Sequence, residues 1–342
     1  MSLSKHILWS ANDPGGANAI IPVVMALHAR GDLCKGLVTG PARDIAVRAG
    51  VEYVDATSFG DAELQKEIEL FVPDVLLAGR SIGYTVDKRL LELLKKEGIP
   101  SVYVLDFWNY YWQRFSEKEK DYVYLPDIVC VMDELAKEEM VAEGIPAERI
   151  AVTGNPYFEH FADTVTCDGE DTHEILFISQ PLRKDAGNRY GFDEYEVFEY
   201  IQEAFELLPH TYHLCIRLHP REDADKYNEY LKNRVSLSSE KTLEESLSKA
   251  GLVIGMFSSV LMQAALAGKR VLSVQPRSVG RDLLPTNRTG MTRKIVDKQA
   301  LREALAEYVS GAYPCPIAGG TSLYPKGAVG RIVQIIDTIH AS

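Results

Sequence analysis

The stretch LVIGMFSSVLMQAALAGKRVLSV, residues Leu252–Val274, decides the fold. An apolar run ends at Ile254, a turn carries Gly255, and a helix-length segment follows until Gly268 closes it before a second apolar run. Apolar runs separated by helix-length segments are typical of a parallel sheet that helices cover on both faces. The stretch therefore predicts a strand, a helix and a second, parallel strand in succession.

The same alternation fills most of the chain. The other strand-like runs include HILWS, PDVLLAG, SVYVLD, DIVCVM, RIAVTGNP, EILFIS and HLCIRL. A polar, acidic stretch between Asn155 and Thr172 interrupts the alternation once. We therefore predict an α/β fold with two Rossmann-like, doubly wound parallel-sheet domains that face a cleft. One long doubly wound sheet is the alternative.

Composition and charge narrow the class of protein. The 342 residues are 46% hydrophobic and 25% charged, as in a globular protein. The formal net charge of -12 argues against nucleic-acid binding, which needs a basic face, but it is compatible with a small anionic ligand held by local groups. The five cysteines are scattered without a C-x-x-C pair, so the sequence predicts neither a metal site nor a disulfide framework.

Apolar segments of membrane-spanning length are not apparent in the sequence. No apolar run approaches the ~20 residues that cross a bilayer, and the start carries neither a signal peptide nor a transit pattern. We expect a cytoplasmic protein without a transmembrane segment, for which peripheral membrane association stays open.

Candidate site residues follow from the predicted topology. Ligands of open parallel sheets bind beyond the carboxyl ends of the strands. The residues at those positions are, in the first half, Asp13, Gly15, Gly16, Arg80, Asp106, Trp108 and Asn155, and in the second half, Ser179, Gln180, His219, Ser258 and Ser259.

Ser258 and Ser259 begin the helix predicted in the opening stretch. A serine at a helix start commonly acts as a cap worth ~1 kcal/mol, and capping accounts for one of the two. A helix start also offers free backbone N–H groups and a partial positive charge, so two hydroxyls there suit a phosphate group. We expect phosphate binding at this turn, with capping alone as the alternative.

His219 ends the run HLCIRL and precedes Pro220. Proline removes a backbone donor and ends a strand, which leaves the imidazole at the sheet edge. There it could donate a hydrogen bond to a phosphate oxygen and stabilise the charge that develops as a nucleotide leaves. Arg217 and Arg221 could raise the local positive potential, and a purely structural histidine is the alternative.

The turn NDPGGAN, residues Asn12–Asn18, follows the first predicted strand. Gly15 and Gly16 would let the backbone approach a ligand, and Asp13 could accept the proton of an acceptor hydroxyl. An ordinary turn in which Asp13 caps the helix is the alternative. The turn lacks the G-x-G-x-x-G fingerprint of dinucleotide-binding proteins, so NAD is not expected and no other cofactor is predicted.

Asp106 is the second candidate base, because it follows the run SVYVL. The next six residues, FWNYYW, are mostly aromatic, and Trp108 could stack on a sugar or pack a helix onto the sheet. Arg80 could clamp a carboxylate of the substrate, and Asn155 could contact an acceptor. The sequence leaves the choice between Asp13 and Asp106 open.

Several short motifs together resemble the GT-B superfamily of nucleotide-sugar enzymes. They are VTGNP, SQP, the His-Pro pair of RLHPRE, the serine pair of MFSSVLMQAALAGK, and RVLSVQP. The pattern looks most like the bacterial sialyltransferase, Kdo-transferase and glycerophosphotransferase types that use CMP- or CDP-linked donors. It also resembles the UDP-N-acetylglucosamine 2-epimerases, although the chain has GMFSS where those enzymes carry an acidic-Ser-Gly-Gly turn.

The resemblance implies that the two domains bind different parts of the substrates. Residues 1–160 would hold the acceptor, residues 161–325 would bind the nucleotide without a required metal, and the helix of residues 326–342 could pack back toward the first domain. His219, Ser258 and Ser259 match the superfamily's contacts to the donor phosphates. Many members grip the ribose with a glutamate near the position of Gln263, whose amide can still bond hydroxyls.

We therefore expect a metal-independent glycosyltransferase of bacterial surface-polysaccharide or glycoconjugate synthesis. Its partners would be a CMP-, CDP- or UDP-linked sugar donor and a sugar or glycan acceptor, which Asp13 or Asp106 would deprotonate. An epimerase or hydrolase that acts on UDP-N-acetylglucosamine is the first alternative, since fold does not fix function. A non-catalytic nucleotide-binding protein is the second.

Overall fold

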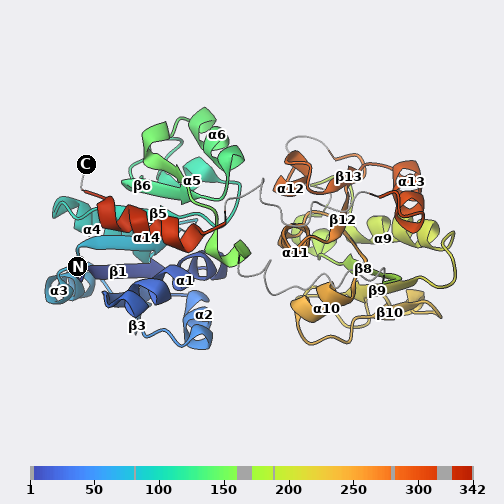
Figure 1. The fold of residues 1–342 in the computed structure, drawn as a ribbon, viewed down its shortest axis with the longest axis horizontal. Helices are drawn as coiled ribbons and strands as arrows, with labels where there is room; N and C mark the ends of the chain where they lie inside the picture. The colour runs from blue at the N-terminus through green and yellow to red at the C-terminus, as the bar shows by residue number, and fades with distance from the viewer. Residues whose placement is uncertain are drawn as a thin grey trace. The chain divides into compact units, whose positions relative to one another are not determined.

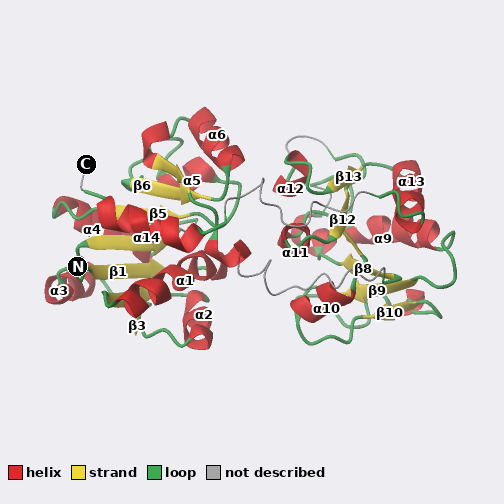
Figure 2. Ribbon diagram, viewed as in Figure 1, coloured by secondary structure: helices red, strands yellow, loops and turns green. Residues whose placement is uncertain are grey.

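A computed structural model describes residues 4–80, 82–159, 172–187, 189–278, 282–313 and 326–340 of the chain. The chain divides into two compact units, Met1–Glu159 with Thr321–Ser342, and His160–Gly320. Each unit contains one sheet with helices packed against it (Figures 1 and 2). None of the helices in the described part of the chain has the length and apolar character that crossing a membrane requires.

The sheet of the first unit has seven parallel strands. In spatial order they are β3 (Val54–Asp55), β2 (Leu33–Val38), β1 (His6–Ala11), β4 (Val75–Gly79), β5 (Ser101–Val104), β6 (Ile128–Val131) and β7 (Ile150–Val152). The helices are α1 (Pro14–Arg30), α2 (Ala42–Ala49), α3 (Asp61–Phe71), α4 (Val86–Lys96), α5 (Tyr111–Phe115), α6 (Glu134–Glu143), the 3-10 turn η1 (Ala147–Arg149) and α14 (Ala328–Thr338). The strand order reverses between β1 and β4, which makes that point the expected ligand crevice of this sheet.

The last helix of the chain, α14, belongs to the first unit. Ile332 and Ile336 on α14 are fully buried in the same apolar cluster as Ile20 and Val24 of α1. Figure 1 shows the red α14 beside the blue α1. The apolar face of α14 is therefore covered by the N-terminal domain, although residues 314–325 before it lie outside the described part.

The sheet of the second unit has six parallel strands. In spatial order they are β10 (Val235–Leu237), β9 (His213–Arg217), β8 (Glu174–Ile178), β11 (Leu252–Gly255), β12 (Arg270–Val274) and β13 (Arg293–Ile295). The helices are α8 (Leu182–Ala186), α9 (Glu194–Phe205), α10 (Leu243–Lys249), α11 (Ser259–Leu266), α12 (Pro285–Arg288), α13 (Lys298–Val309) and the 3-10 turn η2 (Asn228–Tyr230). The strand order reverses between β8 and β11, so the expected crevice lies beside those two strands.

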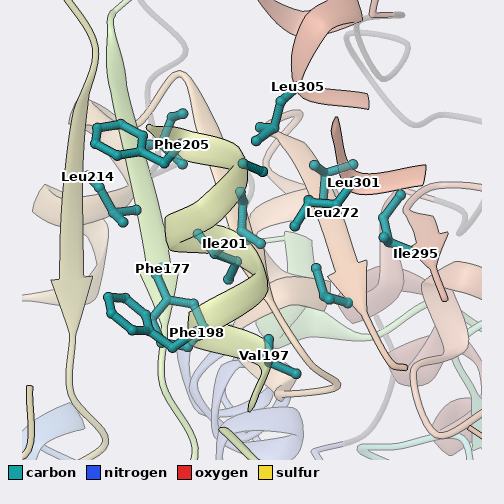
Figure 3. Close-up of a cluster of buried hydrophobic side chains, with 14 of the residues drawn as sticks. Phe177, Val197, Phe198, Ile201, Phe205, Leu214, Leu272, Ile295, Leu301 and Leu305 are labelled. Atoms are coloured by element: carbon teal, nitrogen blue, oxygen red, sulfur yellow. The ribbon is translucent and has the colours of Figure 1, made fainter. Parts of the chain in front are cut away.

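The core of the second unit forms where α9 lies on the sheet. Asp193 caps α9 by accepting the N–H groups of the two residues that follow Glu194. Apolar side chains then recur at helical spacing along one face of α9, and Figure 3 shows them against strand and α13 residues. The residues of this buried cluster that Figure 3 labels are Phe177, Val197, Phe198, Ile201, Phe205, Leu214, Leu272, Ile295, Leu301 and Leu305.

The predicted fold class is confirmed. The stretch Leu252–Val274 forms β11, α11 and β12, and the two strands pair in parallel from Leu252 with Arg270 to Gly255 with Ser273. The alternative of one long sheet is wrong, because β1–β7 and β8–β13 form separate sheets. The predicted cleft between the domains stays a prediction.

Candidate functional site

Four predicted polar positions of the second unit follow adjacent strands. His219 comes after β9, Ser179 and Gln180 after β8, and Ser258 after β11 (Figure 1). Because the order of these parallel strands is β9, β8, β11, their carboxyl ends meet at one edge of the sheet. The edge includes the point of strand reversal, where ligands of doubly wound sheets bind.

The two serines of the β11–α11 turn have different roles. The hydroxyl oxygen of Ser258 accepts the N–H of Val260 at 3.1 Å and caps α11. Ser259 is exposed, and within the described residues its hydroxyl makes no hydrogen bond. As the first residue of α11, Ser259 also has a backbone N–H without an acceptor inside the helix. Ser259 therefore offers two donors at the positive end of a helix.

Neighbouring strands hold the backbone of this turn in place. The side-chain oxygen of Gln180, after β8, accepts the Phe257 N–H at 3.0 Å. From β12, the hydroxyl of Ser273 donates to the Met256 carbonyl, and Gln275 donates to the Ser273 hydroxyl at 2.8 Å. Gln180, predicted as a phosphate contact, thus uses its oxygen to support the turn. Such support fixes the donors of the turn before a ligand arrives.

The imidazole of His219 has a defined orientation. Its Nδ1 accepts the N–H of Arg221 at 3.1 Å, so the proton of the neutral ring lies on Nε2. The side chain is half-buried, which leaves Nε2–H as a donor at the sheet edge. Burial lowers the pKa of His219, and the neighbouring Arg221 cation lowers it further. We therefore expect a neutral His219 at pH 7 that donates from Nε2.

We predict that His219 titrates below the ordinary histidine pKa of ~6.5. Replacing Arg221 by glutamine removes one cause of the lowered pKa, so the His219 midpoint should rise in that variant. A titration followed by NMR of the imidazole carbon-bound protons measures both values. A wild-type midpoint above ~6.5, or an unchanged midpoint in Arg221→Gln, would contradict this electrostatic description.

Ser179 differs from its predicted environment, whereas the predicted ribose contact of Gln263 stays a prediction. Ser179 is 1% exposed, and its hydroxyl contacts Glu222 at 2.9 Å and Tyr227 at 2.8 Å. The expected phosphate contact by Ser179 is therefore wrong, because its side chain points into a buried network. The side-chain oxygen of Gln263 on α11 is buried and has no hydrogen-bond partner among the described residues. A hydroxyl donor would satisfy that oxygen.

Gly15 and Gly16 serve the packing of the first unit. A Cβ on Gly16 would lie 2.8 Å from the carbonyl of Gly79 at the end of β4, and a Cβ on Gly15 would overlap the carboxylate of Asp106. Protein atoms therefore fill the space that a side chain would need at either position, and the expected backbone contacts of the two glycines to a ligand stay a prediction. The same closeness places the turn after β1 against the residue that follows β5.

Asp106 and Asp13 lie at this edge of the first sheet. Arg114 Nη1 donates to Asp106 Oδ1 at 2.9 Å, and the Asp106 side chain is 24% exposed. The Asp13 carboxylate accepts the side-chain amide of Asn12 at 2.8 Å and makes no cap contact with α1. The capping alternative for Asp13 is therefore wrong, and both carboxylates stay candidate bases.

Arg80 is not a clamp for substrate. Its side chain is fully buried and forms an ion pair with Asp87. The remaining guanidinium hydrogens go to the Arg114 carbonyl at 2.8 and 2.6 Å, to the Gly83 carbonyl at 3.2 Å and to the Thr85 hydroxyl at 3.3 Å. No donor of Arg80 is left for a ligand, so this prediction is wrong. The residue follows β4 as expected, but its side chain points inward.

Trp108 and Asn155 are likewise part of the interior. The indole of Trp108 is 4% exposed, donates to Asp133 at 2.8 Å and stacks on Phe158 with ring centres 5.6 Å apart. Asn155 is 1% exposed and donates to the Leu105 carbonyl at 3.2 Å. The predicted acceptor contacts of both residues are wrong, because each side chain supports the loops after β5 and β7.

Two residues of the site were not anticipated from the sequence. Arg114 holds Asp106, and Glu222 accepts both the backbone N–H of His219 and the hydroxyl of Ser179. The role of Glu222 could have been predicted from its spacing. A carboxylate three residues after the first residue of a turn can accept the backbone N–H of that first residue. Within the described residues, no group of three His, Cys, Asp or Glu side chains is arranged to hold a metal ion.

Comparison with known proteins shows similarity in three dimensions alone. No family model and no curated protein matches the chain. The solved UDP-GlcNAc 2-epimerase from Methanocaldococcus jannaschii has a TM-score of 0.69 at 15% identity, over 96% of this chain and 99% of that one. The enzyme of that name from Neisseria meningitidis, bound to UDP-GlcNAc, has a TM-score of 0.66 at 16% identity, over 96% and 99%.

A glycosyltransferase has the same fold. The glycotransferase of kitacinnamycin has a TM-score of 0.59 at 16% identity, over 92% of this chain and 95% of that one. These identities are too low to transfer an activity, and the matches extend over nearly the full length of both partners. The chain therefore has the GT-B fold.

Proposed function

We propose that this chain is an enzyme that binds a nucleotide sugar and breaks the bond between the anomeric carbon and the phosphate oxygen. The observation that carries the proposal is the pair of donors at one sheet edge, Ser259 at the start of α11 and His219 after β9. They follow the strands on either side of β8. The N–H and hydroxyl of Ser259 would bind phosphate oxygens, and Nε2–H of His219 would donate to the same group.

The chemistry of this bond cleavage matches those donors. Negative charge grows on the phosphate oxygen as it leaves the sugar, and fixed donors stabilise that charge more than they stabilise the intact substrate. The positive end of α11 adds to the effect. The buried, unpartnered oxygen of Gln263 could accept a hydroxyl of the nucleotide's ribose.

For the substrate, we propose a UDP-linked N-acetylhexosamine and inversion at its C2 as the leading reaction. Support comes from solved structures of the same fold, several of which are named UDP-GlcNAc 2-epimerases. Removal of the C2 proton as the bond from C1 to the phosphate oxygen breaks leaves a double bond between C1 and C2. Inversion is complete when a proton adds to the other face of C2 and the phosphate oxygen adds back to C1, so the reaction requires a group that removes a proton and a group that returns one. Asp13 and Asp106 are two carboxylates at one edge of the first sheet, and either could exchange that proton.

Transfer of the sugar to an acceptor hydroxyl is the second candidate. Support for it is the turn GMFSS, which differs from the acidic-Ser-Gly-Gly turn of the epimerases, together with the fold match to a glycotransferase. Transfer needs one carboxylate as base, and Asp106 would suit that role because Arg114 holds its position. The sequence favours this reaction, whereas the structural matches favour inversion.

Incubation with UDP-N-acetylglucosamine alone separates the two candidates. The leading proposal predicts that the 2-epimer or free UDP forms without an acceptor, as followed by proton NMR. Consumption that starts only when a sugar acceptor is added would support transfer instead. If UDP-N-acetylglucosamine neither binds nor reacts under either condition, both candidates are wrong.

The two serines of the turn should respond differently to replacement by alanine. Ser258→Ala removes the cap of α11 and should lower the free energy of unfolding by ~1 kcal/mol. Ser259→Ala removes one donor from a charged ligand and should weaken UDP binding about tenfold, with little change in stability. Thermal unfolding and calorimetric titration with UDP measure both effects. The reverse assignment of the two effects would contradict the proposed phosphate contact.

A further inference from the structure

The turn that carries His219 is closed on itself by Glu222. The Glu222 carboxylate oxygen Oε2 accepts the backbone N–H of His219 at 2.8 Å, and the Glu222 N–H donates to the His219 carbonyl at 2.9 Å. Between them, the Arg221 N–H donates to Nδ1 of the His219 ring at 3.1 Å. The conformation of this turn therefore determines which ring nitrogen accepts a hydrogen bond.

The second oxygen of the Glu222 carboxylate has partners of its own. Oε1 accepts the Ser179 hydroxyl at 2.9 Å and forms an ion pair with Lys226, and the Glu222 side chain is 2% exposed. Lys226 is itself held by Glu194 at 2.7 Å and lies 4.7 Å from the ring centre of Tyr195. A carboxylate with donors on both oxygens has one orientation in which all of them are satisfied.

We infer that Glu222 is a positioning residue that keeps neutral His219 in the tautomer with its proton on Nε2. When Glu222 holds the turn, the Arg221 N–H needs an unprotonated Nδ1 as its acceptor. The Nε2–H is then available for a phosphate oxygen of a nucleotide diphosphate. The identity of that ligand rests on the proposed function, whereas the tautomer follows from the contacts of this chain alone.

Replacement of Glu222 by glutamine tests the inference. The amide would have to turn its NH2 group toward another donor, either the His219 N–H or the Lys226 ammonium, so one of the two contacts is lost. Glu194→Gln is the matched control. Its carboxylate binds the same lysine and is also 2% exposed, but it makes no contact with His219 among the described residues.

The tautomer is read from the ring nitrogen-15 shifts at about pH 8, above the titration of His219. Wild-type protein and Glu194→Gln should show Nδ1 as an unprotonated acceptor. Glu222→Gln should show a mixture in which Nδ1 carries the proton part of the time. The affinity for UDP should fall about tenfold in Glu222→Gln and stay unchanged in Glu194→Gln.

A Glu222→Gln protein that keeps a single Nε2–H tautomer would overturn the inference. If that variant does not fold, Glu222→Asp preserves the charge and shortens the reach, so it should show the same mixed tautomer. A tautomer mixture in Glu194→Gln as well would also overturn the inference, since the mixture would then come from a general loss of rigidity in this domain. If wild-type protein does not bind UDP, the proposed function fails, and the nitrogen shifts still decide the role of Glu222.

Discussion

Replacing Asp87 by asparagine should lower the free energy of unfolding by about 3–5 kcal/mol. Asp87 is the partner of Arg80, and both side chains are fully buried. The substitution keeps the volume but leaves the Arg80 cation with backbone carbonyls and one hydroxyl as its remaining acceptors. A buried charge without a counter-charge is costly because no water replaces the lost partner.

The pair between Asp61 and Arg89 provides the control for this measurement. The Asp61 side chain is 71% exposed, and its carboxylate lies 2.7 Å from the Arg89 guanidinium. Asp61→Asn should change the free energy of unfolding by about 0–1 kcal/mol, because water screens an exposed pair. Chemical denaturation of the two variants gives both values. Equal losses would show that Arg80 is not the buried charge that the structure describes.

Replacing Gly79 by alanine should also destabilise the protein, by about 1–3 kcal/mol or more. A Cβ at this position would overlap the backbone carbonyl of Gly16. Displacing the backbone at either residue would break regular hydrogen bonding, since Gly79 ends β4 and Gly16 lies in the first turn of α1. The substitution should also displace the turn after β1, so any activity that uses Asp13 or Asp106 should fall with it.

Gly330→Ala is the matched control for Gly79→Ala. Gly330 lies inside α14, and a Cβ there would meet no atom within 4 Å. Alanine is the better helix former, so this variant should gain roughly 0.5–1 kcal/mol. Thermal unfolding of the pair measures the difference. A tolerated Gly79→Ala would mean that α1 and β4 do not approach each other as described.

The sequence contained most of the information about the fold. Strands that are apolar on both faces need cover on both faces, and the helices that connect parallel strands provide it, which is why Leu252–Val274 predicts its own structure. The same pattern locates strand ends, so it finds His219, Ser258 and Ser259 at one edge. Position along a strand is a local property, and local patterns report it well.

Side-chain direction at those ends could not be predicted in the same way. Arg80, Trp108 and Asn155 follow strands as expected, yet each points inward. Their directions depend on partners far along the chain, such as the Arg114 carbonyl for Arg80 and the Leu105 carbonyl for Asn155. The periodicity of the sequence does not indicate which distant residues become hydrogen-bond partners. A residue at a strand end can therefore be either a ligand contact or a structural support.

Calorimetric titration of UDP tests the central claim most directly. The proposed site predicts that UDP binds wild-type protein and that the double variant His219→Ala, Ser259→Ala loses about 100-fold or more in affinity, since each donor to a charged ligand contributes about tenfold. The Glu194→Gln protein serves as the folded control with the site intact. UDP that binds the double variant as tightly as wild type, or that does not bind wild type, would contradict the claim that this edge holds a nucleotide phosphate.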